Sequence, residues 1–183
     1  MSQTLQAWVH TLQFAAQDII SVELRPVQGD FPAFEAGSHI DLHLPNGQIR
    51  QYSLTNAQGT ATQTSYQIAV ARDANSRGGS AWIHDKLRTG NSLSISAPRN
   101  LFELDTAALG KVLFIGAGIG ITPIYAMVKA AQQNGMDWQL MACARSASRL
   151  ACQEELHALD PRRVQFHFDM EQGTPLNLEA LLS

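Results

Sequence analysis

The chain has 183 residues, 16% of them charged, with a formal net charge of -3 and a sequence pI near 6.0. This mild acidity and the absence of any run of Lys or Arg argue against a nucleic-acid-binding surface. No stretch approaches the roughly 20 apolar residues of a membrane-spanning helix, and residues 1–8 lack the basic and apolar regions of a signal peptide, so we expect a cytoplasmic protein with no membrane partner.

The first half of the chain, from Leu5 to about Leu104, consists of short alternating apolar and polar runs separated by Gly, Pro and Asn. This alternation predicts antiparallel strands joined by hairpins, and their spacing favours a small barrel or sandwich. A single helix is expected at Ser80–Leu87, with Ser80 as its N-cap and Gly90 as its terminator. The strands are predicted at 18–24, 39–44, 49–54, 66–71 and 92–96.

The pattern changes after Gly110, where continuous apolar runs alternate with helical stretches. Strands that alternate with helices predict a parallel sheet covered on both faces. The boundary between the two halves falls near residues 105–110. Strands are predicted at 112–115, 138–143 and 164–168, and helices at 123–133 and 150–159, with a further helix beginning within 176–183.

Two short motifs in the first half could carry chemistry. In Arg50–Leu54, alternation places Arg50, Tyr52 and Leu54 on one face of a strand and Ser53 on the other, which by itself is typical of any half-exposed barrel strand. The stretch 76–80, Ser-Arg-Gly-Gly-Ser, opens the single helix of this half. Consecutive glycines at a helix start suit a bound phosphate, but a flexible, capped turn explains them equally well.

A third motif, Gly116–Pro123, lies between a buried strand and a helix. Its glycines run Gly-x-Gly-x-Gly, and Ile121 stands where the dinucleotide fingerprint requires the last glycine. Thr122 and Pro123 suit the N-cap and first helical positions. The motif is therefore either a nucleotide-binding turn or a well-capped helix start.

The order and spacing of these motifs, together with the intervening Ala97–Asn100, resemble the ferredoxin reductase-like flavoprotein reductases. The resemblance extends over nearly the whole chain and is strongest to the phthalate dioxygenase reductase and vanillate demethylase reductase type, which serve oxygenases. It implies a two-domain fold. An N-terminal antiparallel β-barrel that binds flavin, residues 1–105, would be followed by an incomplete α/β parallel-sheet domain that binds NAD(P), residues 110–183.

The resemblance implies specific roles around the flavin. Arg50 would bind its phosphate, while Tyr52 would pack on the isoalloxazine and Ser53 would hydrogen-bond near N5, where hydride arrives, so that Tyr52 and Ser53 are the catalytic pair. A planar guanidinium, a flat ring with a polar tip and a hydroxyl that donates or accepts suit these tasks. The implied flavin-binding residues are Arg50, Tyr52, Ser53, Leu54, Ala69, Val70, Ala71, Arg77, Gly78, Gly79 and Ser80. A phosphate held at an internal helix start favours FMN, with FAD as the alternative.

The resemblance also implies a nicotinamide site in the second half. Gly116, Gly118 and Gly120 would pass under the ribose and pyrophosphate, with Thr122 near the nicotinamide. Arg145 and Ser146, after the second strand, would meet the adenosine ribose. No acid stands in 144–149 to bind a 2'-hydroxyl, and Arg suits a 2'-phosphate, which favours NADPH. The resemblance to oxygenase reductases favours NADH, which we prefer, with NADPH as the alternative.

The implied activity is that of a flavoprotein oxidoreductase that passes electrons from NAD(P)H through flavin to an iron-sulfur centre, as the reductase component of an oxygenase system. Cys143 and Cys152 are the only cysteines and do not have a cluster-binding spacing, so a 2Fe-2S cluster would belong to a missing domain or a ferredoxin partner, with a terminal oxygenase beyond it. The alternatives are a reductase acting directly on oxygen, free flavin or haem, and a catalytically impaired flavin-binding fragment.

Relatives of this type continue beyond the point where this chain ends, with a strand leading to a Cys-Gly-Pro segment near the nicotinamide. We therefore expect a fragment or a naturally short product. The barrel should hold flavin better than the incomplete second half holds nicotinamide, because an apolar stripe lacks its covering sheet. That stripe consists of Leu176, Leu178, Leu181 and Leu182.

No metal site is expected. His39, Asp41 and His43 share one face of a predicted strand and could bind a metal, but polar residues alternating with Ile and Leu are more typical of a solvated barrel face. Cys143 lies in an apolar strand pattern and is predicted to be a core residue.

Overall fold

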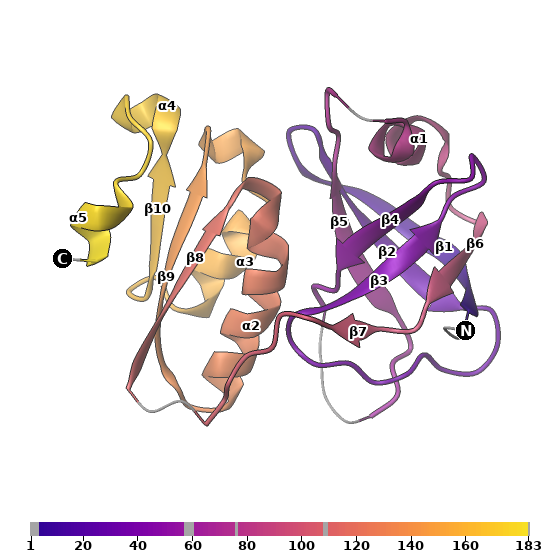
Figure 1. The fold of residues 1–183 in the computed structure, drawn as a ribbon, viewed down its shortest axis with the longest axis horizontal. Coiled ribbons are helices and arrows are strands. Elements are labelled where there is room, and N and C mark those ends of the chain that lie inside the picture. The colour runs from indigo at the N-terminus through magenta and orange to yellow at the C-terminus, as the bar shows by residue number, and fades with distance from the viewer. Residues whose placement is uncertain (1–3, 57–60, 76, 108–109, 183) are drawn as a thin grey trace.

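The computed structural model describes residues 4–56, 61–75, 77–107 and 110–182, and these form two units that lie side by side (Figure 1). The first is an antiparallel sheet and the second a parallel sheet with helices, as predicted. Ser76, the first residue of the glycine motif, and the terminal Ser183 lie outside the described residues. None of the helices in the described ranges is long and apolar enough to cross a membrane.

The first unit is a closed antiparallel sheet with strand order β4-β3-β6-β1-β2-β5, in which β7 pairs with β3. Its two ends meet where the amide of Thr55, just after β4, donates to the carbonyl of Gln67 on β5 at 2.9 Å. This contact closes the sheet into a barrel. The strands are β1 (Thr4–Ala16), β2 (Ile19–Pro26), β3 (Ser38–His43), β4 (Ile49–Ser53), β5 (Tyr66–Ala71), β6 (Ser92–Ser96) and β7 (Arg99–Asn100).

Strand β3 shows how alternation builds the barrel, and where the prediction fails. Ser38, Ile40 and Leu42 are buried inside, as period-two alternation requires. The opposite face was expected to be solvated, which is wrong: His39 and Asp41 are half-buried, because β7 pairs alongside and Arg99 reaches the Asp41 carboxylate at 2.7 Å.

The barrel's helix, α1 (Gly79–Lys86), begins one residue earlier than predicted. Its N-cap is Gly78, which adopts the left-handed conformation with φ 100°, and not Ser80. The Ser80 hydroxyl instead accepts a hydrogen bond from the Asp73 amide at 3.2 Å. The helix ends before Leu87, so Gly90 belongs to the following turn and is not the terminator that the sequence suggested.

The second unit has three parallel strands, as predicted, and their order in the sheet is β10-β9-β8. They are β8 (Lys111–Ala117), β9 (Asp137–Ala144) and β10 (Val164–Phe168), with helices η1 (Gly118–Gly120), α2 (Ile121–Gln133), η2 (Ala147–Arg149), α3 (Gln153–Leu159), α4 (Asp169–Gln172) and α5 (Leu178–Leu182). The helix predicted from Leu150 starts only at Gln153, because Cys152 is left-handed with φ 59°. Cys143 is buried, as predicted, and burial raises the pKa of its thiol.

Helix α2 lies between the parallel sheet and the barrel (Figure 1). Its buried residue Met127 belongs to one apolar core with Ala16, Ile19 and Ala69 of the barrel. The barrel side of this core is made largely of alanines, so the two units approach closely. Apolar burial of this kind stabilises by about 25 cal/mol per Å² removed from water.

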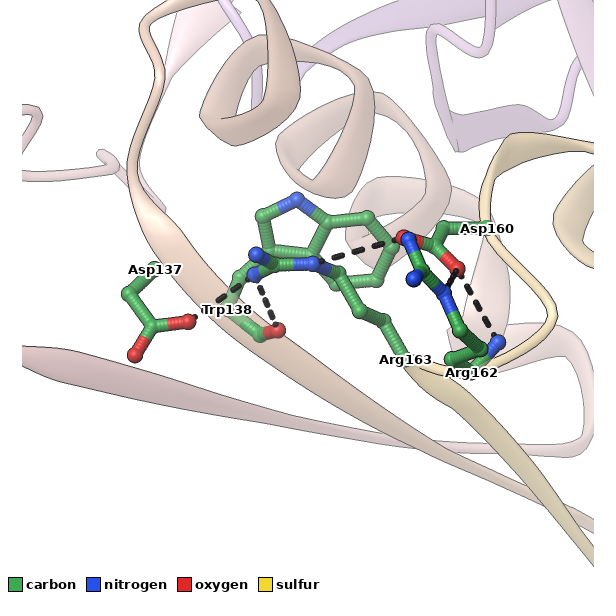
Figure 2. Close-up of polar contacts among 5 residues, drawn as sticks. All are labelled: Asp137, Trp138, Asp160, Arg162 and Arg163. Atoms are coloured by element: carbon green, nitrogen blue, oxygen red, sulfur yellow. Dashed lines mark hydrogen bonds and ion pairs between the residues drawn. The ribbon is translucent and has the colours of Figure 1, made fainter.

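The amino ends of β9 and β10 are tied together by one charged cluster, drawn in Figure 2. Arg163 donates to the Asp137 carboxylate at 2.9 Å and to the Trp138 carbonyl at 3.0 Å, and its guanidinium lies 5.6 Å from the Trp138 ring centroid. Asp160 joins Arg162 and Arg163, and hydrogen bonds from Arg162 lower the pKa of its carboxyl. This cluster lies at the edge opposite the glycine motif and stabilises the sheet.

The segment that joins the units passes close over Gly37. A Cβ at this position would lie 1.8 Å from the Phe102 carbonyl oxygen, and the residue has φ +93°. Glycine is therefore required here both for its backbone conformation and for the space it leaves.

Gly37→Ala should lower the free energy of unfolding by about 3 kcal/mol, through left-handed strain and the clash with Phe102. Gly47→Ala is the matched control, because its φ of +79° imposes the strain but no atom lies within 4 Å of the new Cβ; it should cost about 1 kcal/mol. Urea unfolding of both variants measures the difference, and equal losses would contradict the close approach.

Candidate functional site

The site is built where the β3–β4 hairpin meets the glycine turn that opens α1. Arg50, on β4, lies against Gly79, since a Cβ at Gly79 would come within 2.5 Å of the Arg50 Nε. The Arg50 side chain is half-buried, and its guanidinium donates to the Ile49 carbonyl at 2.9 Å and to the Gln48 amide oxygen. Two motifs separated by almost thirty residues in the sequence thus form one surface.

The hairpin also holds the turn through its own side chains. The Gln48 amide nitrogen donates to the Arg77 carbonyl, and the Asn46 amide nitrogen donates to the Gly78 carbonyl at 3.3 Å. Both residues were missed in the sequence, although the Asn-Gly turn signal at 46–47 predicted a hairpin tip at this place. They fix the path of the glycine turn relative to Arg50, whereas the Arg77 side chain is exposed.

Tyr52 and Ser53 lie at a cavity of about 230 Å³ between the two units. Its other walls are Phe102 of the connecting segment and Pro123 near the start of α2. The structure therefore brings the predicted catalytic pair of the barrel next to the glycine motif of the second unit.

The electrostatics of this cavity are set by burial. Burial raises the pKa of the Tyr52 hydroxyl to about 12, against the opposing charge of Arg50, so the phenol is neutral at physiological pH. His39, which pairs with Ser53 across β3 and β4, also lines the cavity. Its Nε2 is buried and has no hydrogen-bond partner among the described residues, and burial lowers its pKa.

His39 was treated in the sequence as part of a solvated face. Its position opposite Ser53 follows from the β3–β4 register, which the sequence pattern alone did not fix.

The glycine motif forms a tight strand-to-helix turn at the carboxyl end of β8. Gly116 is buried under Ile121, whose Cδ1 would lie 2.8 Å from a Cβ at Gly116, whereas Gly118 and Gly120 have open space above them. Thr122 was predicted as N-cap, which is wrong. Gly120 takes that position, and the Thr122 hydroxyl donates back to the Ile119 carbonyl at 2.9 Å.

The carboxyl ends of β9 and β10 present the other polar residues of this edge. Arg145 is exposed, and the Ser146 hydroxyl lies 3.1 Å from that of Ser148. Asp169 directly follows β10, and its neighbour Met170 donates its amide to the Arg145 carbonyl at 3.0 Å. No acid stands in 144–149, and the carboxylate at this edge comes instead from Asp169, directly after the third strand.

Other predicted residues lie apart from this surface. Leu54 and Val70 are fully buried in the barrel core, so only their backbones could contact a ligand. Ala69 faces α2 instead and borders a larger cavity of about 730 Å³ between the units, while Ala71 packs against the same core as Ala69. Arg50, Tyr52 and the glycine turns do not line that larger cavity. The candidate site is therefore identified by the motifs that converge on it, and not by cavity volume.

Comparison with known proteins agrees with this geometry. A sequence model of the oxidoreductase NAD-binding domain matches residues 114–173. The chain is 52% identical, over its full length, to a putative toluene-4-sulfonate monooxygenase system reductase subunit from Comamonas testosteroni. It is 44% identical, over 98% of its length, to a vanillate O-demethylase oxidoreductase from Pseudomonas sp. strain HR199.

The chain is thus similar to reductase components of oxygenase systems. It spans a little over half the length of these relatives, 58% and 56% respectively. Among solved structures, phthalate dioxygenase reductase superposes with a TM-score of 0.87 at 32% identity, over 97% of this chain and 56% of that one. An intact type IV self-sufficient cytochrome P450 monooxygenase superposes with a TM-score of 0.91 at 34% identity, over 97% of this chain and 23% of the larger protein.

The tyrosines give a test of the site's burial. Burial raises the pKa of Tyr52 and Tyr125 to about 12 and the pKa of Tyr66 still further. The pKa of a tyrosine in the unfolded chain is about 10. A tyrosine whose pKa is raised in the folded state contributes its full stabilisation below about pH 10, and this stabilisation is lost as the pH rises towards about 12.

At pH 11 the native chain should therefore show little of the phenolate absorbance near 295 nm that the urea-unfolded chain shows. Tyr52→Phe should remove one of the three late-titrating groups and leave the other two. Titration of Tyr52 near pH 10 in the native chain would contradict its burial in the cavity.

Proposed function

We propose that this chain is the flavin- and NADH-binding part of a reductase that passes electrons to an iron-sulfur acceptor of an oxygenase system. The observation that carries the proposal is the contact between Arg50 and Gly79. It joins a guanidinium to the amide-rich start of a helix, and two residues further along β4 Tyr52 lines the cavity shared with Ser53 and Pro123.

The residues at this surface fit a flavin phosphate. Arg50 offers parallel donors in a plane, and the turn at Gly78–Ser80 offers backbone amides and the positive end of the α1 dipole. Because Gly79 has no Cβ, the Arg50 side chain can lie directly against the start of the helix. A phosphate bound there would accept hydrogen bonds from both.

Around the ring, the roles follow from what each side chain can do. Tyr52 is neutral and offers an aromatic face, so it would pack on the isoalloxazine without adding charge. The Ser53 hydroxyl would donate to, or accept from, the ring nitrogen N5. Flavin, when bound, supplies the ability to accept a hydride and to release single electrons. The residues of the chain would orient the flavin ring, exclude water from it and hold the nicotinamide of NADH over it.

A phosphate at this internal helix start is the terminal group of FMN, whereas FAD needs further contacts for its adenosine half. We therefore infer FMN as the flavin. NADH is inferred as the electron donor, because Asp169 places a carboxylate at the carboxyl edge of the sheet, where ribose hydroxyls bind in open α/β folds.

The partners are inferred from the relatives, which are reductase components of oxygenase systems. Phthalate dioxygenase reductase is described as a modular structure for electron transfer from pyridine nucleotides to a 2Fe-2S centre. The described residues hold no group of three His, Cys, Asp or Glu side chains suited to a metal. An iron-sulfur domain or ferredoxin and a terminal oxygenase would therefore receive the electrons.

The phosphate contact is tested by comparing two flavins. Arg50→Gln should weaken FMN binding by about 10- to 100-fold, because a charged hydrogen bond to phosphate contributes roughly 1.5–3 kcal/mol. Binding of riboflavin, which lacks the phosphate, should be nearly unchanged. Fluorescence quenching of each flavin on titration with protein measures both affinities.

Arg25→Gln is the matched control, because Arg25 lies on β2 and forms an ion pair with Glu23 on the barrel surface. An equal loss of FMN and riboflavin in Arg50→Gln would argue against the phosphate role. Failure of the wild-type chain to bind either flavin would refute the proposed function.

The choice of NADH is tested at Asp169. Asp169→Asn should strengthen binding of 2',5'-ADP relative to 5'-AMP by about fivefold, since it removes a negative charge that repels a 2'-phosphate at partly solvated distances. Isothermal titration calorimetry gives the ratio, with the nearby Glu171→Gln as control. An unchanged ratio would place the ribose elsewhere.

A further inference from the structure

The tip of the β1–β2 hairpin reaches across to the second unit. The Gln17 amide donates to the Ser148 carbonyl at 2.7 Å, and the Ser148 hydroxyl donates to the Gln17 side-chain oxygen at 3.2 Å. Beside them, Arg149 pairs with the Asp18 carboxylate at 2.9 Å. Three polar contacts therefore join residues 17–18 of the barrel to residues 148–149, which belong to the loop after β9.

The hairpin tip is itself rigidly held. Asp18 has φ 61°, in the left-handed region that Asp and Asn enter more easily than most residues. Its carbonyl accepts a hydrogen bond from the Arg72 amide at 2.7 Å, which ties the tip to the chain just after β5. Because the tip is held in place, the residues that contact it, Ser148 and Arg149, are held at a fixed position relative to the barrel.

The segment that the hairpin tip contacts lies at the carboxyl edge of the parallel sheet, where the glycine motif also lies. Residues 146–149 begin directly after Arg145 at the carboxyl end of β9, beside Asp169 at the end of β10. The apolar core under α2 also joins the units, but apolar packing is non-directional, whereas hydrogen bonds and an ion pair fix orientation. The tip contacts are thus suited to set the angle at which the nucleotide edge faces the barrel.

We propose that Gln17 and Asp18 form a latch that positions the second unit over the flavin-binding barrel, and that the Asp18–Arg149 ion pair is its salt-sensitive part. The latch borders the cavity of about 730 Å³ between the units, which Gln17 and Ser148 both line, so opening of the latch would admit water to the interface. Asp18 and Arg149 are positioning residues and touch no reacting atom.

The side chains of Asp18 and Arg149 are 44% and 42% exposed, so water and salt screen their attraction. A pair of this kind shifts an opening equilibrium by about two- to fivefold. That range is small enough for reversible opening and large enough to measure.

The test is amide hydrogen exchange of the full chain, followed residue by residue by NMR. The Gln17 amide is the direct reporter, because its own hydrogen bond to Ser148 must break before exchange. Asp18→Asn keeps a residue that tolerates the left-handed conformation and removes only the charge. It should speed Gln17 exchange about two- to fivefold, and Arg149→Gln should do the same from the other side.

Asp137→Asn is the matched control, since it breaks an exposed ion pair of the same 2.9 Å length at the opposite edge of the second unit (Figure 2). It should leave Gln17 exchange unchanged. The exchanged pair Asp18→Arg with Arg149→Asp should restore protection. Raising NaCl to about 1 M should speed Gln17 exchange in the wild type but not in Asp18→Asn, because screening acts only where the ion pair exists.

Hydrogen exchange needs neither flavin nor nucleotide, so failure of the latch is distinguishable from failure of the proposed function, on which its positioning role rests. Unchanged Gln17 protection in both Asp18→Asn and Arg149→Gln would overturn the latch. Faster exchange together with unchanged FMN affinity and a slower rate of flavin reduction by NADH would support its positioning role. Faster exchange with an unchanged reduction rate would show that the contact does not position the nucleotide, and would overturn that role.

Discussion

The candidate site depends on one close contact, the seating of the Arg50 side chain against the backbone of Gly79. Any side chain at position 79 would occupy the space of the guanidinium. Because of this contact, strand β4 of the barrel and helix α1 present their polar groups to the same point. The hairpin residues Asn46 and Gln48 reinforce it from outside by holding the carbonyls of the turn. The phosphate site proposed here would need no dedicated pocket, because backbone amides and one guanidinium can bind a phosphate.

The candidate site also requires that the barrel and the second unit pack closely against each other, with helix α2 between the barrel and the parallel sheet (Figure 1). Alanines on β1 and β5 let helix α2 approach the barrel, and Gly37 lets the connecting segment pass close to the barrel at Phe102. Small residues therefore allow close approach at the interface, as Gly79 allows the close approach of Arg50 in the barrel. The cavity at Tyr52, Ser53 and Pro123 exists only because these approaches are close.

The two halves of the site differ in how they use glycine. In the barrel, Gly78 adopts a left-handed conformation and caps α1, while Gly79 leaves room for a side chain. In the second unit, Gly116 is covered by Ile121, whereas Gly118 and Gly120 open towards solvent. The departure from the dinucleotide fingerprint at Ile121 is thereby explained. Ile121 fills the space over Gly116 that would otherwise be left between strand and helix.

The sequence by itself determined the two kinds of sheet, their order along the chain and most strand positions, because residue periodicity reports directly which faces are buried. The order and spacing of the motifs also led to the predicted site residues, and the structure brings Arg50 and Gly79 into contact. The prediction from sequence was wrong on details that depend on local competition. Gly78 and Gly120 displaced Ser80 and Thr122 as N-caps, since both side chains found backbone partners elsewhere.

Only the tertiary structure decided which residues share a surface. The register of β3 against β4 put His39 opposite Ser53, and the parallel pairing of β9 with β10 put Asp169 beside Arg145. The latch between Asp18 and Arg149 joins positions more than a hundred residues apart. Such contacts depend on register and on the packing of whole units, and a pattern read along one chain contains neither.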